Sequence, residues 1–228
     1  MPDVTPPGRL IGSGRAADVY DIGGGRVLRR YRIRSDTGPE ARIMTYLRRS
    51  GFPVPEVFDA DGPDLVLARL AGPDMLADLG RRPWRVTERA RILAGLHDRL
   101  HELAAPDWLT PLPEAAGDRV LHMDLHPGNV MLTGAGPVVI DWSSAAAGPP
   151  GADTAMAALI MRTSQVDDLP APVRLATAVL RRTFIRRFES GVTADSAPHV
   201  AEVARLRLRD PNVRPAEAAR LRDILAES

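Results

Sequence analysis

One short segment constrains this 228-residue chain more than any other. Asp124 and Asn129 lie five residues apart in the pattern H-x-D-x-x-x-x-N, which begins at His122. Pro127 and Gly128 fall between them and break any regular helix, so the sequence predicts a loop there. The side chains of Asp124 and Asn129 are therefore expected to project from the same loop.

Two short apolar stretches follow this loop, over residues 130–132 and 138–140, and we interpret them as the strands of a hairpin. Asp141 comes directly after the second stretch. Because a hairpin brings its two ends together, we expect Asn129 and Asp141 to meet. A carboxylate and an amide oxygen, completed by the phosphates of a nucleotide, suit Mg²⁺, which is rarely enclosed by protein ligands alone.

The same residues allow a second interpretation, a metal-binding strand. His122, Asp124 and His126 alternate, and alternate residues of a strand share one face, where they could bind a metal. Pro127 and Gly128 argue against a continuing strand, and no further histidine lies close by. We therefore favour a structural role for both histidines, as hydrogen-bonding partners of the loop.

The segment H-M-D-L-H-P-G-N-V, followed by the I-D-W that contains Asp141, closely resembles the aminoglycoside phosphotransferase family, which shares the fold of protein kinases. The resemblance implies that Asp124 is the catalytic base and that Asn129 and Asp141 hold magnesium. Protein kinases carry a lysine two residues after the catalytic aspartate and D-F-G at the metal aspartate. This chain has His126 and D-W-S there, which is the small-molecule-kinase version.

A glycine-containing stretch near the N-terminus matches G-x-G-x-x-G-x-V, except that Ala17 replaces the third glycine. Gly12 and Gly14 allow the backbone to bend tightly and to present N–H groups to phosphates. An ordinary hairpin turn would look the same, but its position ahead of the catalytic segment favours the first interpretation. The resemblance implies that Gly12, Ser13 and Gly14 cover the nucleotide.

The chain contains no lysine, which is consistent with the composition of a GC-rich bacterial genome. Arg29, on a strand expected over residues 26–31, falls where the family has its phosphate-binding lysine. Arginine is permanently charged and can hold phosphate through two N–H groups, but it is bulkier. We expect Arg29 to contact phosphate with altered alignment and a lower rate; an exposed strand arginine is the alternative.

A helix is expected to open at Thr37, and Glu40 lies three residues later, the spacing of a capping box. By the resemblance, Glu40 also corresponds to the helix glutamate that pairs with the strand lysine. Both interpretations stay open, and we favour an ion pair between Glu40 and Arg29.

Further along, the resemblance implies that backbone groups from Ala68 to Leu70 bind adenine where the chain crosses between lobes.

The remaining helices are expected over residues 86–105, 154–163, 171–190, 196–208 and 215–226. His97 and His101 could bind a metal from adjacent turns, but no third ligand accompanies them, so we interpret them as packing residues. Asp153 has two equally supported roles: a brace for the catalytic loop, as in the family, or an ordinary acidic residue at a helix N-terminus.

The expected fold class is α+β, a two-lobed protein-kinase-like fold. Residues 1–70 would form a nucleotide-binding lobe with an antiparallel sheet and one helix, and residues 71–228 a larger, mostly helical lobe. The content of 44% hydrophobic and 26% charged residues suits such a core. A net charge of +1 implies no strong electrostatic attraction to nucleic acid or membrane, and the lack of cysteine excludes disulfides. No signal peptide is visible and no apolar run approaches the ~18 residues of a membrane span, so we expect a cytoplasmic protein. We expect it to be a monomer or a homodimer.

The expected function is transfer of the γ-phosphate of ATP or GTP, with Mg²⁺, to a hydroxyl of a small molecule such as an antibiotic, sugar or amino alcohol. Antibiotic resistance would be one possible consequence. From residue 150 onward there are twelve arginines and ten acidic residues, which disfavours a polycationic aminoglycoside. The alternative is a non-catalytic, pseudokinase-like regulator, supported by the missing lysine and third glycine. A protein kinase is less consistent with the missing D-F-G.

Overall fold

The computed structural model describes residues 7–14, 16–33, 36–113, 115–164, 170–210 and 213–227. By its internal contacts the chain divides into two units. The first contains Met1–Gly72 and Met131–Ser143, and the second contains Pro73–Val130 and Ser144–Ser228. The sequence predicts a division after residue 70, close to the first crossing, but it does not assign the segment 131–143 to the first unit.

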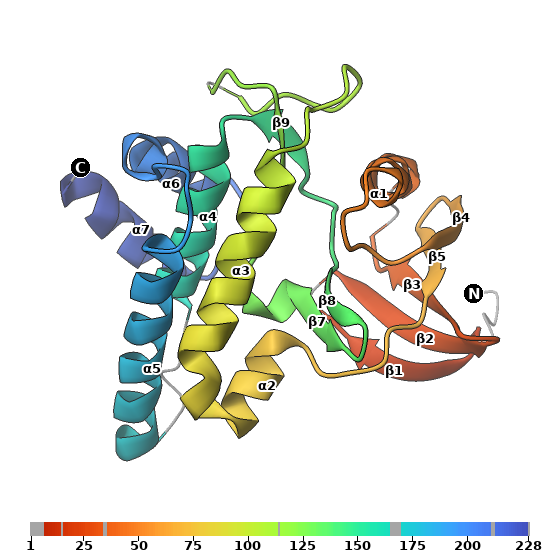
Figure 1. Ribbon diagram of the computed structural model, residues 1–228, viewed down its shortest axis with the longest axis horizontal. Helices are drawn as coiled ribbons and strands as arrows, with labels where there is room; N and C mark the ends of the chain where they lie inside the picture. The colour runs from red at the N-terminus through yellow and green to blue at the C-terminus, as the bar shows by residue number, and fades with distance from the viewer. Residues whose placement is uncertain are drawn as a thin grey trace. The chain divides into compact units, whose positions relative to one another are not determined.

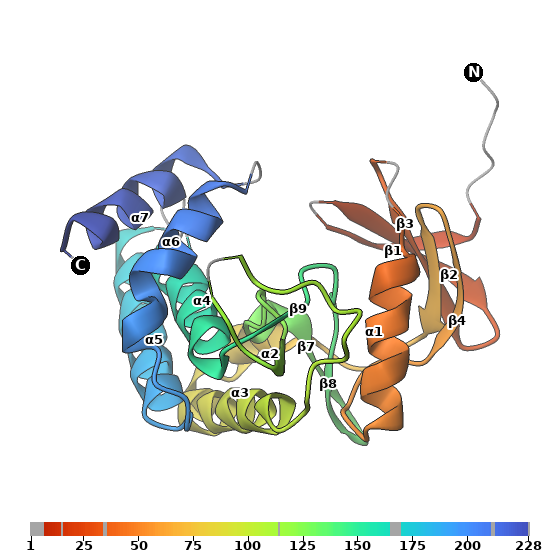
Figure 2. The same ribbon diagram turned by 90° about the horizontal axis from the view of Figure 1, so that it is seen from above.

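The first unit is built on a five-stranded antiparallel sheet in the order β1-β2-β3-β5-β4. Its strands are β1 (Arg9–Ser13), β2 (Ala17–Gly23), β3 (Arg26–Tyr31), β4 (Val57–Asp61) and β5 (Asp64–Ala68). Helix α1 (Gly38–Arg49) lies beside the sheet near β4 (Figure 2). The α1 side chains of Ile43, Met44 and Leu47 are buried, as the spacing of apolar residues predicts.

The turn between β2 and β3 sets the register of the central strand. Gly23, Gly24 and Gly25 all have positive φ angles, of 80°, 60° and 70°, a conformation that glycine adopts at little cost. The register that follows places Arg29 opposite Val19 on one side and Leu65 on the other. Arg29 therefore projects from the middle of the sheet.

A separate hairpin, β7 (Val130–Thr133) and β8 (Gly136–Val139), packs with the first unit, and its strands lie where the sequence predicts them. The Val139 N–H donates to Pro53 O at 2.8 Å. Gly72 has a φ of 139°, and a Cβ there would lie 2.1 Å from Leu132 O. Three residues after the hairpin, Trp142 is buried with its ring edge-on to Phe52. These contacts hold Asp141 in the first unit.

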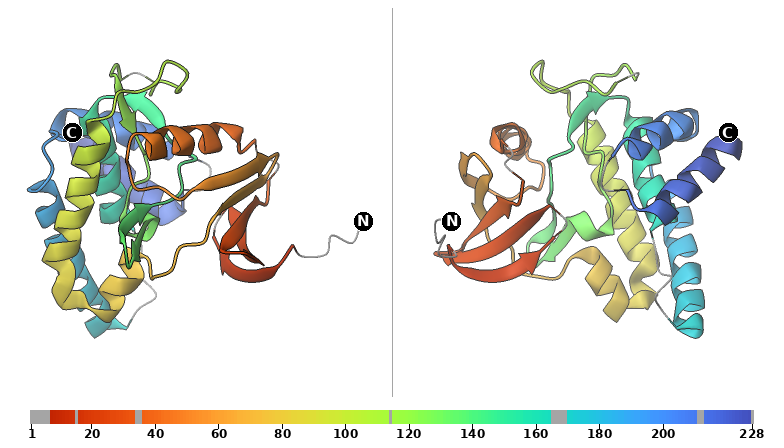
Figure 3. Two further views of the ribbon diagram at one scale, coloured as in Figure 1. Left: turned by 45° about the vertical axis from the view of Figure 1, so that its right-hand side comes forward. Right: turned by 180° about the vertical axis from the view of Figure 1, so that it is seen from behind.

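The second unit is mostly helical (Figures 1 and 3). Its α-helices are α2 (Met75–Arg81), α3 (Val86–His101), α4 (Pro150–Thr163), α5 (Ala171–Glu189), α6 (Val200–Leu208) and α7 (Pro215–Glu227). Single 3₁₀ turns are η1 (Pro83–Arg85), η2 (Pro127–Asn129) and η3 (Ala197–His199), and β6 (Arg119–Leu121) pairs with β9 (Ala146–Gly148). None of the helices in the described ranges is long and apolar enough to cross a membrane.

Helix α4 occupies the centre of this unit, because almost every residue from Gly151 to Thr163 is buried. Its alanines allow α5, α6 and α7 to pack closely against it. Helix α3 ends at His101, four residues earlier than predicted. The reason is that Ala104 bridges to Arg119 and the Ala105 N–H bonds to Asp118 O, so the backbone groups there serve a strand-like pairing.

His97 is fully buried on α3, which confirms its predicted packing role. Its Nδ1 lies 3.0 Å from Leu93 O, and its ring packs edge-on against Phe188, with centroids 4.9 Å apart. Among the described residues, no hydrogen-bond partner reaches its Nε2. Burial lowers the pKa of His97 to about 4, so the ring is neutral in the folded chain.

Acid should therefore destabilise the protein through His97. Between the ordinary histidine pKa of about 6.5 and the folded-state value, the unfolded chain binds a proton that the folded chain does not. The free energy of unfolding should fall as pH drops through this window, by up to about 3 kcal/mol from this residue. His97→Phe should flatten that part of the profile. Urea unfolding followed by circular dichroism at pH 7.5 and 5 measures it, and an unchanged pH dependence in the variant would contradict the assignment.

Candidate functional site

In the second unit, the predicted catalytic pair is joined by direct hydrogen bonds. The Asn129 Nδ2 group donates to Asp124 O at 2.8 Å and to Asp124 Oδ2 at 3.0 Å. The Asn129 side chain is almost buried, whereas that of Asp124 is 29% exposed. The amide nitrogen of Asn129 is thus committed to Asp124, and its Oδ1 remains as the acceptor that a cation would need.

Two histidines shape this loop from within, as the sequence predicts. His122, which is buried, accepts the Asp124 N–H at Nδ1, at 3.2 Å. His126 Nδ1 accepts the Gly128 N–H at 3.0 Å and thereby caps the 3₁₀ turn η2. The segment after β6 is not a strand, and Met123 has a φ of 63°, so the alternative of a metal-binding strand over residues 122–126 is wrong.

The loop is braced from below by Asp153 in the first turn of α4. Its fully buried carboxylate accepts the N–H groups of Met123 at 2.7 Å and His122 at 3.1 Å. His101 Nε2 lies 3.1 Å from the same carboxylate. Of the two roles open from the sequence, Asp153 performs the bracing one, and His101 is its missed partner. The L-H-x-x-L-H pattern on α3 was the available signal.

Asp153 remains charged although it is buried. Burial by itself would raise its pKa, but the hydrogen bond with His101 and the neighbouring imidazoles outweigh burial and hold the pKa well below its ordinary value. A charged acceptor makes stronger hydrogen bonds to N–H donors than a neutral one. This charge stabilises the left-handed backbone at Met123, which is costly for a residue other than glycine.

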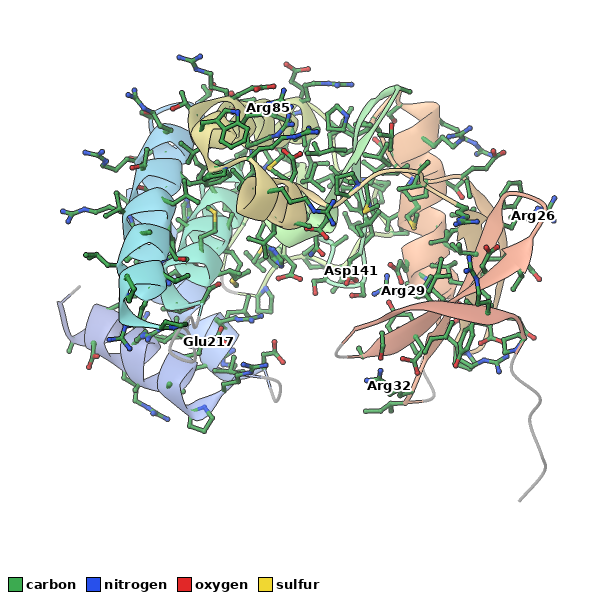
Figure 4. The ribbon with its side chains drawn as sticks, turned by 90° about the horizontal axis from the view of Figure 1, so that it is seen from below. Arg26, Arg29, Arg32, Arg85, Asp141 and Glu217 are labelled. Carbon is green, nitrogen blue, oxygen red and sulfur yellow. The ribbon has the colours of Figure 1, made fainter. Side chains whose placement is uncertain are left out.

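In the first unit, Arg29 joins two carboxylates from distant parts of the chain. Its Nη1 donates to Glu40 Oε1 at 2.9 Å, and its Nη2 donates to Asp141 Oδ1 at 2.6 Å. Figure 4 labels Arg29 and Asp141, whose side chains point toward each other. The Arg29 side chain is only 14% exposed, so the ion pairs are largely shielded from water. The prediction of an ion pair between Arg29 and Glu40 is confirmed.

Glu40 uses both of its oxygens within this cluster. Besides Arg29, Oε1 accepts the Trp142 N–H at 3.0 Å, and Oε2 accepts the Tyr31 hydroxyl at 2.7 Å. The capping-box interpretation is wrong, because Thr37 makes no side-chain cap and its Oγ1 donates to Asp64 O. Sequence reasoning missed Tyr31, although it lies two residues after Arg29 on the same strand.

Burial and the neighbouring carboxylates set the pKa values of Arg29 and Tyr31. Burial would lower the pKa of Arg29, but Asp141 and Glu40 outweigh burial and hold that pKa above its ordinary value. Burial and then the charge of Glu40 raise the pKa of Tyr31 well above its usual range. Arg29 therefore stays cationic and the Tyr31 hydroxyl stays a proton donor throughout the physiological pH range.

The predicted nucleotide-covering residues lie where β1 turns into β2. The Gly14 N–H donates to Ala17 O at 2.9 Å and closes the turn. Ser13 Oγ donates to Asp18 Oδ1 at 2.7 Å, and Arg32 Nη2 reaches both Ser13 Oγ and Asp18 Oδ1 at 2.6 Å. Asp18 and Arg32, which the sequence reading passed over, therefore hold the base of this turn.

The predicted adenine-binding backbone at the end of β5 is partly committed. The Ala68 N–H donates to Glu56 O at 2.9 Å, and the Arg69 N–H donates to Gly25 O at 2.8 Å. In the described part of the chain, the N–H of Leu70 makes no such bond. The N–H groups of Ala68 and Arg69 are therefore occupied by backbone bonds.

The two predicted metal ligands carry oxygen donors, one in each unit. Asn129 Oδ1 and the Asp141 carboxylate are hard oxygen donors, and no group of three or more His, Cys, Asp or Glu side chains in the described ranges could hold a metal ion. Asp141 Oδ1 already accepts Arg29 and, at 3.1 Å, Ser143 Oγ.

Solved kinase structures share this fold. Aminoglycoside phosphotransferase APH(2'')-Ib with ADP is 11% identical at a TM-score of 0.60, with 95% of this chain and 91% of that chain covered. An amicoumacin kinase in complex with AMP-PNP, Ca²⁺ and Ami is 13% identical at 0.56, covering 96% and 86%. A choline/ethanolamine kinase family protein from Mesorhizobium loti is 15% identical at 0.56, covering 99% and 88%. At these identities the likeness establishes the fold, and the predicted α+β kinase-like class is confirmed.

No curated protein sequence matches the chain significantly. The model of one family, described as the phosphotransferase enzyme family (APH), matches residues 7–111 and 67–188. These two overlapping matches take in the glycine-containing turn, Arg29, Glu40, the catalytic loop and Asp153. They cover well over half of the sequence, and so the chain belongs to the phosphotransferase enzyme family.

Proposed function

We propose that this protein transfers the terminal phosphoryl group of ATP or GTP to a hydroxyl group of a small molecule. The observation that carries the proposal is the catalytic loop of the second unit. There Asn129 fixes a partly exposed Asp124 carboxylate, and Asp153 braces the loop by accepting the N–H groups of His122 and Met123. A carboxylate held in one orientation and open to solvent is suited to accept a proton from a bound hydroxyl.

In the proposed reaction, Asp124 orients the acceptor hydroxyl and takes its proton. The acceptor oxygen forms a bond to the γ-phosphorus, the bond from that phosphorus to the β,γ-bridging oxygen breaks, and the nucleoside diphosphate leaves with the electron pair. Little covalent chemistry falls to the protein, so positioning and charge stabilisation supply most of the rate.

Arg29 would hold the phosphates in place of the usual lysine. A guanidinium carries more N–H donors than the two that Glu40 and Asp141 occupy, so Arg29 can keep both partners and still donate to a phosphate oxygen. The turn containing Gly12, Ser13 and Gly14 would cover the nucleotide. The Leu70 N–H and the Ala68 carbonyl would bind its base.

Asn129 and Asp141 would hold Mg²⁺, which when bound neutralises the charge on the transferred phosphoryl group. Their oxygens match the ligands that magnesium prefers, and the donation of the Asn129 amide nitrogen to Asp124 supports this orientation. The sequence expectation that Asn129 and Asp141 come together around one ion remains part of this proposal.

The acceptor should be something other than a polycationic aminoglycoside. A pocket for a polycation needs an excess of carboxylates, and the chain from residue 150 onward has twelve arginines against ten acidic residues. A panel of sugars, amino alcohols, nucleosides and antibiotics, with ATP and Mg²⁺ and phosphate transfer read by mass spectrometry, should give turnover outside the aminoglycosides. Robust phosphorylation of kanamycin would prove this inference wrong.

Asp124→Asn tests the catalytic base with the acceptor that this panel identifies. The amide keeps the shape and can still accept from Asn129, but it cannot take a proton, so kcat should fall by at least about 10²-fold. The affinity for ATP should stay within about twofold, as measured by calorimetric titration. Asp107→Asn, an exposed aspartate in the loop before β6, serves as the matched control and should keep full turnover. Unchanged turnover in Asp124→Asn would remove Asp124 from the mechanism.

Calorimetric titration of ATP with and without Mg²⁺ tests the metal ligand. We expect wild-type affinity to depend on magnesium, and Asp141→Ala to weaken binding by about 10- to 100-fold and abolish that dependence. Asp61→Ala, at an exposed end of β4, should behave as wild type. Binding that is indifferent to magnesium in wild type would contradict the metal role and favour a nucleotide-binding regulator instead.

A further inference from the structure

We propose that Tyr31 is a positioning residue that adapts this kinase to an arginine where its relatives have a lysine. The inference rests on the proposed function, because it assumes that Arg29 contacts the phosphates of the nucleotide. Tyr31 itself would touch neither nucleotide nor acceptor. It would set the plane of the Arg29 guanidinium through its ring, and it would satisfy Glu40 through its hydroxyl.

The ring contact comes first. Arg29 and Tyr31 are two residues apart on β3, so their side chains project from the same face of the sheet. The Arg29 guanidinium carbon lies 4.7 Å from the centre of the Tyr31 ring. Within this distance an aromatic face attracts a cation, and arginine stacks on such a face better than lysine does.

The planar guanidinium of Arg29 depends on contact with the Tyr31 ring more than a lysine ammonium would. Arg29 bonds Glu40 through Nη1 and Asp141 through Nη2, and both bonds can form together only while the guanidinium plane contains the direction to each carboxylate. A lysine ammonium is compact and its donors rotate, so its orientation matters less. With the Tyr31 ring against the guanidinium, rotation about the last torsions of Arg29 is restricted and both bonds persist.

The hydroxyl contributes separately. Glu40 is 95% buried, with Oε1 shared by Arg29 and the Trp142 N–H, and the Tyr31 hydroxyl supplies the donor to Oε2 at 2.7 Å. Without that donor a buried carboxylate oxygen would lose its partner, which is costly. Tyr31 therefore holds the acid that in turn holds Arg29.

The position of Tyr31 in the sheet links two departures from the family pattern. Across β2 and β3, Tyr31 pairs with Ala17, the residue that replaces the third glycine of the nucleotide turn. Its own N–H donates to Pro63 O at 2.9 Å, so its backbone is fixed as well. Tyr31 thus pairs through its backbone with Ala17 and contacts Arg29 through its ring.

The test is a double-mutant cycle between residues 29 and 31, read by calorimetric ATP affinity and, with an identified acceptor, by KM for ATP. Tyr31→Leu in the wild-type background should weaken ATP binding about tenfold, within the range by which contacting residues couple. In an Arg29→Lys background, Tyr31→Leu should change the ATP affinity by less than about threefold, since a lysine ammonium does not need the ring to orient it. Tyr31→Phe, which keeps the ring, should cost less than about threefold in affinity and should lower the melting temperature through Glu40.

Tyr20→Leu is the matched control, a tyrosine on the neighbouring strand β2 outside the cluster, and it should leave ATP affinity unchanged in both backgrounds. Equal losses from Tyr31→Leu in both backgrounds would mean a purely structural role and overturn the inference while the proposed function stands. Wild-type protein that binds no ATP would overturn both. If Tyr31→Leu does not fold, Tyr31→Phe carries the test, and a loss of ATP affinity of about tenfold or more in that variant, although the ring is kept, overturns the inference.

Discussion

The loop that carries Asp124 depends on one buried charge. Asp153 accepts the backbone N–H groups of the two residues just before Asp124. Its carboxylate is ionised and fully buried, so water does not compete for these bonds. The cost of burying that charge is offset by His101 and by the two N–H donors. The left-handed Met123 is stable only while these bonds hold. The position of the candidate base is therefore set from helix α4, about thirty residues further along the chain.

The first unit also contains a buried charge, and this charge is positive. Its buried cation, Arg29, lies between Glu40 and Asp141, and every oxygen of Glu40 is engaged. A buried ion pair is tolerated only when its hydrogen bonds are complete, and the removal of one partner leaves an uncompensated charge. The two units thus each organise their candidate residues around a shielded, fully bonded charge, one anionic and one cationic.

The sequence pattern predicts the strands of the first unit's sheet, the hairpin and the candidate residues Asp124, Asn129 and Asp141, because regular spacing and turn residues determine local structure, but it does not predict the pair β6 and β9. It also predicts the pair of Arg29 with Glu40, through the resemblance. It does not predict which N–H groups near Ala68 are occupied, since backbone bonds leave no side-chain signature. It leaves Asp153 undecided and misses Tyr31 and Asp18, because their partners depend on sheet register and on contacts distant in sequence. The early end of α3 follows from a tertiary pairing with Arg119 that local periodicity does not contain.

The assignment of residues 131–143 to the first unit has a consequence for biosynthesis. The chain passes from one unit to the other after Gly72, returns at Met131 and leaves again after Ser143. Neither unit is a continuous piece, so the N-terminal sheet cannot acquire Asp141 or the Trp142 N–H until most of the chain has left the ribosome. Until then the cluster of Arg29 and Glu40 lacks the bonds that residues 141 and 142 make to it in the complete chain. Completion of the first unit is thereby coupled to synthesis of the catalytic loop that precedes its last segment.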